Sequence, residues 1–203
     1  NYGTITNSAG ASIDLESAGA STISALYVSN LTNAGTIKIV ATSGTGMTSN
    51  WGAGTGALNN TGTFTIDDSA ASSGSTTNFN FTGITNSGTV SLNVPAASTA
   101  ITTVGSGNFN NSGTWSITSH GTGAGNIQIT GGSAYTNTGV INVTDANLTV
   151  AQPLTGTGGV VNLTNDANVT LNGTNTGTGQ TFNFSGGDNT LNVTNGTSFK
   201  GTI

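Results

Sequence analysis

The sequence predicts an all-β protein built as a parallel β-helix, a solenoid whose coils are 20 to 27 residues long. Three observations predict this fold: a nine-residue phrase that returns five times, apolar and polar residues that alternate within it, and a background rich in glycine, threonine, serine and asparagine. A fixed period in the twenties with apolar residues at fixed places is typical of solenoids. At this period the 203 residues make about eight coils.

Each copy of the phrase predicts a strand on either side of a bend. The copies begin at Leu31, Leu58, Ile84, Phe109 and Tyr135. Apolar residues hold the first, seventh and ninth places, and a polar residue separates the last two, which is the period-2 pattern of a strand with one buried face. A lone coil cannot cover that face, so successive coils must stack on one another.

An Asn-x-Gly step separates the two strands of every copy. The pairs are Asn33 and Gly35, Asn60 and Gly62, Asn86 and Gly88, Asn111 and Gly113, and Asn137 and Gly139. We interpret the step as a corner, because asparagine tolerates a left-handed backbone and glycine reaches positive φ without steric cost. Stacked coils would place equivalent asparagines about 4.8 Å apart, where their side chains can form a hydrogen-bonded ladder.

We expect residues 1–203 to form a single solenoid segment with two coil lengths. The corner glycines are separated by 27, 26, 25 and 26 residues, so 1–138 has coils of about 26 residues, whereas 139–203 has coils of 20 to 22 residues. We interpret the shortening as the loss of a bulge or a loop. Asn1 to Ile5 is interpreted as a truncated copy of the phrase, and the glycine-rich stretch around Met47 and Trp51 as a side loop. The absence of an initiating methionine and of a signal peptide predicts a piece of a longer surface protein.

Composition excludes several classes of partner. The net charge is −5, with seven acids, two lysines and no arginine, so the chain cannot neutralise a run of phosphates and we expect no nucleic-acid partner. No apolar run approaches the roughly 18 residues of a membrane span, so we expect no membrane insertion. Without cysteine there is no disulfide or thiolate metal site. The regular return of Ile, Val, Leu and Phe argues against disorder.

Asp145, Asp166 and Asp188 form the one acidic pattern. Each stands three residues before an apolar strand residue in successive short coils, so stacking would line them along one edge. Carboxylates that share a cation would make this edge a Ca²⁺ site. The alternative, which we favour, is an Asx turn before each strand. No other cofactor is expected.

The sequence does not favour a sugar-cleaving enzyme or an ice-binding protein. A sugar-cleaving β-helix could pair Asp67-Asp68 with His120, but these residues lie two coils apart and nothing indicates a carboxyl with the raised pKa that a general acid needs. We therefore expect no catalytic residues and no enzyme. An ice-binding array would need regular threonines, whereas Thr4-Ile5-Thr6 and Thr63-Phe64-Thr65 have no counterparts in most coils.

The Asn-x-Gly-Thr phrase followed by Ile, Val, Phe or Trp, in a charge-poor background rich in Thr, Ser, Asn and Gly, resembles the passenger regions of bacterial autotransporters and of filamentous-haemagglutinin-like adhesins of two-partner secretion. The resemblance implies a right-handed helix outside a bacterial cell, and it transfers no functional residues.

We therefore expect a non-enzymatic, extracellular structural or adhesive rod on a bacterial surface. Its partners would be cell-surface or matrix ligands, or copies of itself stacked end to end or side by side. The alternative is a self-assembling subunit of a surface layer, sheath or biofilm matrix.

Overall fold

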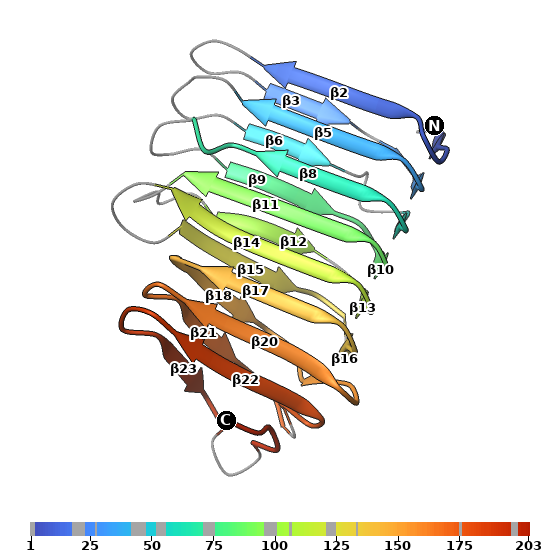
Figure 1. The fold of residues 1–203 in the computed structure, drawn as a ribbon. Helices are drawn as coiled ribbons and strands as arrows, with labels where there is room; N and C mark the ends of the chain where they lie inside the picture. Colours follow the sequence, from blue (N-terminus) through green and yellow to red (C-terminus); the bar gives the residue numbers. More distant parts are fainter. Residues whose placement is uncertain are drawn as a thin grey trace.

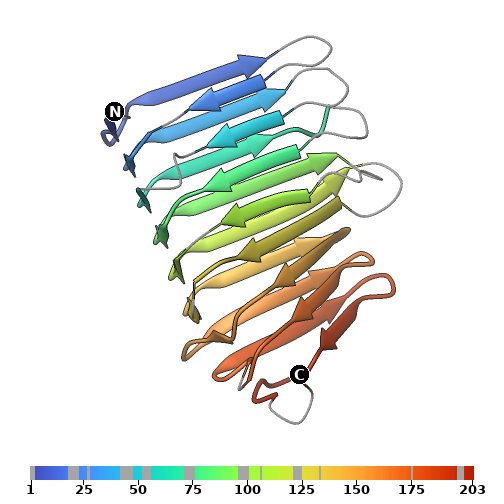
Figure 2. The same ribbon diagram turned by 180° about the vertical axis from the view of Figure 1, so that it is seen from behind.

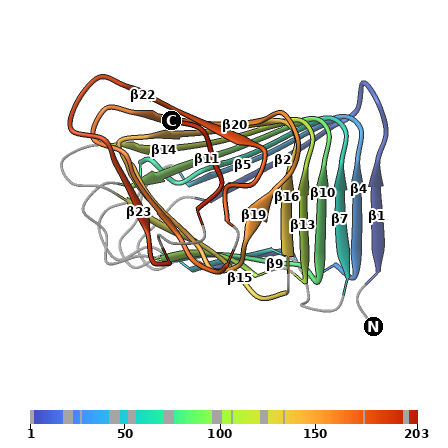
Figure 3. The same ribbon diagram turned by 90° about the horizontal axis from the view of Figure 1, so that it is seen from below.

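The computed structural model describes residues 3–17, 23–26, 28–41, 48–51, 56–70, 76–95, 101–105, 107–120, 125–132, 134–174, 176–195 and 199–203. These residues form strands that stack as a parallel β-solenoid, and no helix occurs among them. Three sheets run side by side along the axis (Figures 1 and 2). Seen along the axis, the sheets enclose the interior as three sides of the coil (Figure 3).

One of the three sheets, which we call the short sheet because its strands are only two to four residues long, contains the first strand of each phrase. Its seven strands are β1 (Thr4–Asn7), β4 (Asn30–Asn33), β7 (Ala57–Asn60), β10 (Gly83–Asn86), β13 (Asn108–Asn111), β16 (Ala134–Asn137) and β19 (Leu154–Thr155). Every neighbouring pair in the sheet is parallel.

The front sheet of Figure 1 carries the second strand of each phrase. Its eight strands are β2 (Ser12–Ser17), β5 (Thr36–Ala41), β8 (Thr63–Asp67), β11 (Thr89–Pro95), β14 (Thr114–His120), β17 (Val140–Thr144), β20 (Gly159–Thr164) and β22 (Gln180–Ser185). The back sheet also has eight strands: β3 (Ile23–Leu26), β6 (Thr48–Trp51), β9 (Thr76–Asn80), β12 (Ile101–Gly105), β15 (Gly125–Thr130), β18 (Ala146–Val150), β21 (Asn168–Leu171) and β23 (Thr190–Val193). Trp51 thus ends strand β6, where we had expected a side loop; Met47 lies outside the described residues.

Alternation puts the apolar residues inside. In β17 and β20 every second side chain is buried, as the period-2 pattern predicts. The core is continuous along the axis, and in its middle Phe109 packs edge-on against Trp115 and Tyr135, with ring centroids 5.0 and 6.0 Å apart. The buried Tyr135 hydroxyl donates to the carbonyl oxygen of Gly131 at 2.6 Å, and burial raises the pKa of Tyr135 to about 12.

The coils shorten at the corner between the front and back sheets. Thr118 pairs with Thr144, and Gly125 pairs with Ala146. In one coil the chain therefore passes from the front sheet to the back sheet over seven residues, from 118 to 125. In the next coil the equivalent passage, from 144 to 146, takes only two residues. The single residue between β17 and β18, Asp145, turns this corner with a φ of 50°. Most of the shortening therefore occurs at this corner.

The corner glycines stack in one column, but for a reason that differs from our expectation. None of Gly35, Gly62, Gly88, Gly113 and Gly139 has positive φ, and neither has any asparagine of the five corner pairs. A Cβ built on Gly88 would instead lie 2.1 Å from the carbonyl oxygen of Gly62, and Gly113 and Gly139 meet the preceding glycine at the same distance. The backbone of the preceding rung passes so close that only a residue without a side chain fits.

Candidate functional site

An inner ladder of asparagine side chains runs along the corner of the short sheet. Each amide nitrogen donates to the amide oxygen of the next rung at 2.7 or 2.8 Å, in the order Asn7, Asn33, Asn60, Asn86, Asn111 and Asn137. The same nitrogens also donate to the backbone of the next rung, as Asn60 does to the carbonyl oxygen of Thr89 at 3.0 Å. All six side chains are buried. The ladder that the repeats predict is therefore confirmed, and it satisfies amides that would be costly to bury alone.

The inner ladder starts one rung earlier than the five corner pairs. Ile5 pairs with Leu31 and Asn7 pairs with Asn33, so the first copy of the phrase begins at Ile5. Our interpretation of Asn1 to Ile5 as a truncated copy was therefore wrong. The first copy has two extra residues between Asn7 and Ser12, which pairs with Thr36. That insertion hid the repeat in the sequence.

Gln180, which lies two rungs beyond Asn137, provides the last side chain of the inner ladder. The position that follows Thr155, the register partner of Thr136, is Gly156, which has no side chain to continue the column. Gln180 fills this place: its amide oxygen accepts from Asn137 at 2.8 Å, and its nitrogen donates to the carbonyl oxygens of Asn137 and Gly156. Its register partner Gly159 leaves the necessary space, since a Cβ there would lie 2.5 Å from both polar atoms of the Gln180 amide. No sequence repeat indicated this role.

A second, outer ladder lies on the exposed face of the front sheet. Asn183 donates to Asn162 at 2.9 Å, Asn162 donates to Asn142 at 2.8 Å, and Asn142 donates to the hydroxyl of Ser116 at 3.2 Å. These four residues, which we call the outer ladder, are consecutive register partners of β14, β17, β20 and β22. Beside them Thr164 and Ser185 share a hydrogen bond of 3.2 Å between their hydroxyls.

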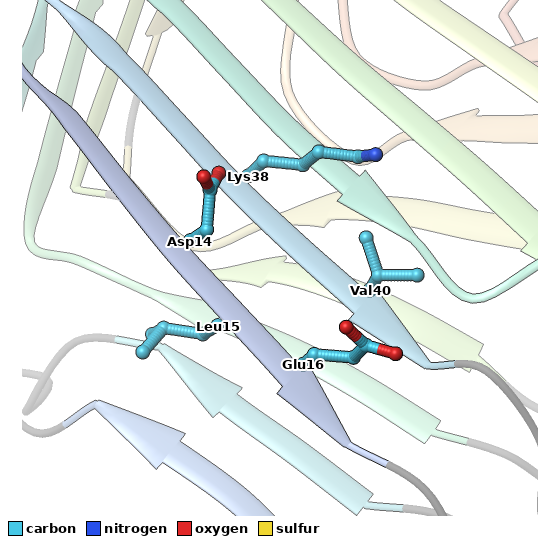
Figure 4. Close-up of a pocket in the computed structure, with 5 residues that line it drawn as sticks. All are labelled: Asp14, Leu15, Glu16, Lys38 and Val40. Atoms are coloured by element: carbon cyan, nitrogen blue, oxygen red, sulfur yellow. The ribbon is translucent and has the colours of Figure 1, made fainter.

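Charge divides the front sheet into two parts. Near its start, Asp14 of β2 lies opposite Lys38 of β5, and Glu16 lies opposite Val40. Together with Leu15 these residues line a shallow pocket of about 240 Å³ (Figure 4). From β11 onward, the outward-facing positions whose side chains the structure describes carry only Thr, Ser, Asn and Val. Phe184, which pairs with the buried Leu163, is also 39% exposed in the last strand, β22.

The three aspartates of the short coils occupy equivalent places. Asn147, Asn168 and Thr190 are register partners, so Asp145, Asp166 and Asp188, each two residues earlier, share one corner. Asp145 and Asp166 have positive φ, which agrees with a role in turns, and the backbone nitrogen of Asp188 donates to the Asp166 carboxylate. Among the described residues no group of three or more His, Cys, Asp or Glu side chains could hold a metal ion. The Ca²⁺ hypothesis stays a prediction.

The pairing of Asp67-Asp68 with His120 does not resemble a catalytic site. Asp67 follows the outward pattern of β8 and accepts from the nitrogen and hydroxyl of Ser69 at 3.2 and 2.5 Å, as in a turn. Asp68, in contrast, is buried, with 3% of its surface exposed. The strand register puts β11 between β8 and the strand that ends at His120, so the two-coil separation is confirmed.

One family model matches the whole chain. Residues 1–203 match the model of the family described as hyphally regulated cell wall protein N-terminal. The chain belongs to this family. A cell wall protein is extracellular, so the expected location at the cell surface is confirmed in its general form. Comparisons with curated proteins and with solved structures found no significant match.

The cell wall family corrects one part of the resemblance. The expectation of a surface β-solenoid holds, whereas the match does not support a bacterial autotransporter or two-partner-secretion passenger. The resemblance itself has a physical cause. The Asn and Gly of the corners are required by the close stacking of rungs, so the same phrase can recur in unrelated chains that form such coils. No helix in the described part of the chain is long and apolar enough to cross a membrane.

Proposed function

We propose that this chain is a non-enzymatic rod of the cell wall that displays an adhesive surface. The observation that carries the proposal is the joint continuity of the core and the inner ladder, from Asn7 to Gln180, in a chain of the cell wall family. Continuous hydrogen bonding and side-chain packing from rung to rung make such a stack stiff along its axis.

The placement of the acidic residues supports a role without catalysis. The two neighbouring carboxyls Asp67 and Asp68 diverge, one bound to Ser69 in a turn and the other buried. Hydrolysis of a glycosidic bond needs two carboxyls facing one another across the scissile bond. A rod that holds on to wall components without cutting them fits the arrangement better.

The proposal is tested with the purified chain and isolated cell wall fragments. We expect the protein to sediment with the fragments, to remain monomeric by analytical ultracentrifugation at the same concentration, and to release no reducing ends from them. A protein that stays in the supernatant but forms large assemblies by itself would favour the lattice subunit. Release of reducing ends, lost in the Asp67→Asn, Asp68→Asn double variant, would overturn the non-enzymatic role.

A further inference from the structure

The outer ladder holds polar groups in a fixed array that faces solvent. Asn162 uses one amide hydrogen to bind Asn142 and accepts one hydrogen bond from Asn183. Its amide nitrogen has a second hydrogen, and its oxygen has a second lone pair. The hydrogen bonds between rungs therefore fix the side chains and leave at Asn162 one donor and one acceptor that no hydrogen bond among the described residues uses. Groups fixed in advance lose little conformational entropy when they bind a ligand.

The repeat of this array runs along the solenoid axis. Neighbouring rungs of a β-sheet are separated by about 4.8 Å. This distance is close to the length that one sugar ring adds to an extended β-linked chain. A polysaccharide lying along the axis would thus present one ring to each rung, with its hydroxyls beside the amides of Asn142, Asn162 and Asn183.

The surroundings of the outer ladder indicate the kind of polysaccharide. The described outward positions of β14, β17, β20 and β22 carry no charge, so the face offers nothing to pair with uronates, sulfates or amino sugars. Val140 and Val160 are register partners on the same face and are partly exposed, which provides a narrow apolar strip for the C–H faces of the rings.

We propose that the outer ladder and its neighbours on β14, β17, β20 and β22 form a binding face for an extended, uncharged β-linked glucan. This proposal rests on the adhesive role proposed above and specifies its ligand. The described face is uncharged and hydrogen-bonding, and the family is one of cell wall proteins, which lie in a matrix built of polysaccharide. Because no ion pair contributes, salt should not weaken the binding.

The experiment measures retention of the purified chain on microcrystalline cellulose, with chitin and alginate beads as the other arms. We expect retention on cellulose that is unchanged between low and high NaCl, weaker retention on chitin, and none on alginate. Removing three amides (Asn142→Ala, Asn162→Ala, Asn183→Ala) should lower the affinity for cellulose about tenfold or more, because each lost hydrogen bond contributes to binding. The matched control removes three outward asparagines of the back sheet (Asn147→Ala, Asn168→Ala, Asn192→Ala) and should bind within about twofold of the original chain.

A second variant guards against a folding defect. Thr164→Arg leaves the four residues of the outer ladder in place and adds a bulky charge beside them, so it should also abolish retention while its far-ultraviolet circular dichroism stays unchanged. If both face variants bind cellulose like the original chain, or if chitin or alginate is preferred, the glucan face is wrong. If the original chain binds wall fragments but none of the three polymers, the inference falls and the adhesive role stands. If it binds neither fragments nor polymers, both fall.

Discussion

The inner and outer ladders are built from the same amide-to-amide hydrogen bond in two different environments. Asn86 accepts from Asn60 at 2.8 Å in the interior, and Asn142 accepts from Asn162 at 2.8 Å on the surface. Water can replace a partner at Asn162, which is partly exposed, but cannot reach Asn86, which is fully buried. Equal hydrogen-bond lengths therefore do not imply equal contributions to stability. We infer that the inner ladder holds the rungs together, whereas the outer ladder is free to bind.

The largest effect should come from the glycine column beside the inner ladder. In Gly88→Ala the new Cβ would lie 2.1 Å from the carbonyl oxygen of Gly62, so neighbouring rungs must separate. We expect the free energy of unfolding to fall by about 4 kcal/mol or more, measured by urea denaturation. The control is Gly83→Ala, whose Cβ would meet nothing within 4 Å, and it should stay within about 0.5 kcal/mol. Similar losses in the two variants would show that close approach does not explain the column.

The direct comparison of the ladders uses one substitution in each. Asn86→Ala deprives the buried amides of Asn60 and Asn111 of a partner and should lower the free energy of unfolding by about 3 kcal/mol. Asn162→Ala should cost under about 1 kcal/mol, because water can satisfy its former partners. Both values come from chemical denaturation at the same pH. Equal costs would refute the division of roles between the ladders.

Buried Tyr135 should make the core sensitive to alkali. Its pKa rises from 10.0 to about 12 on folding, so the folded state holds its proton more tightly than the unfolded state. Below pH 10 both states are protonated and this group adds no pH dependence; between pH 10 and 12 the unfolded state ionises first, and about 2 kcal/mol of stability is lost. Tyr135→Phe should remove this part of the decline in thermal melts between pH 9 and 12. A decline of the same size in the Phe variant would place its origin elsewhere.

Replacing Gln180 should show how much the last side chain of the inner ladder contributes to stability. Gln180→Ala leaves the amide of Asn137 without its 2.8 Å partner, although Asn137 keeps a weaker contact with Val160 at 3.4 Å. We expect a loss of about 1–2 kcal/mol, concentrated at the last rungs. Amide hydrogen exchange should accelerate at Gly156 and Gly159, while rungs near Asn33 exchange as before. Uniform acceleration along the rod would contradict a local role.

The smallest effect is expected at Asp145, Asp166 and Asp188. Because positive φ at two of them indicates turns, the melting temperature should be the same in EDTA and in millimolar Ca²⁺. Asp166→Asn preserves the turn-forming side chain and serves as the matched variant. Ca²⁺-dependent stabilisation of the original chain that disappears in Asp166→Asn would restore the metal site.

Several predictions from the sequence were wrong for one shared reason: they considered only neighbours along the chain. The corner glycines were assigned to positive φ because that is the usual local reason for glycine, yet the backbone of the preceding rung requires them. Trp51 was placed in a loop because the stretch around it is rich in glycine, yet pairing with β3 and β9 makes it part of a strand. Gln180 and the outer ladder depend on which residues face one another across rungs. Only the repeated Asn142, Asn162 and Asn183 between apolar residues could have indicated the latter.

The sequence by itself determined the all-β class, the coil period, the alternation that makes a core and the buried asparagine ladder. These follow from short-range patterns repeated many times, so each copy reinforces the same register. The tertiary structure alone decided why glycine is required at the corners, where the coils shorten, how Gln180 closes the ladder and which asparagines face solvent. All four depend on atoms in neighbouring rungs, which lie about 5 Å apart in space but roughly a full coil apart along the chain.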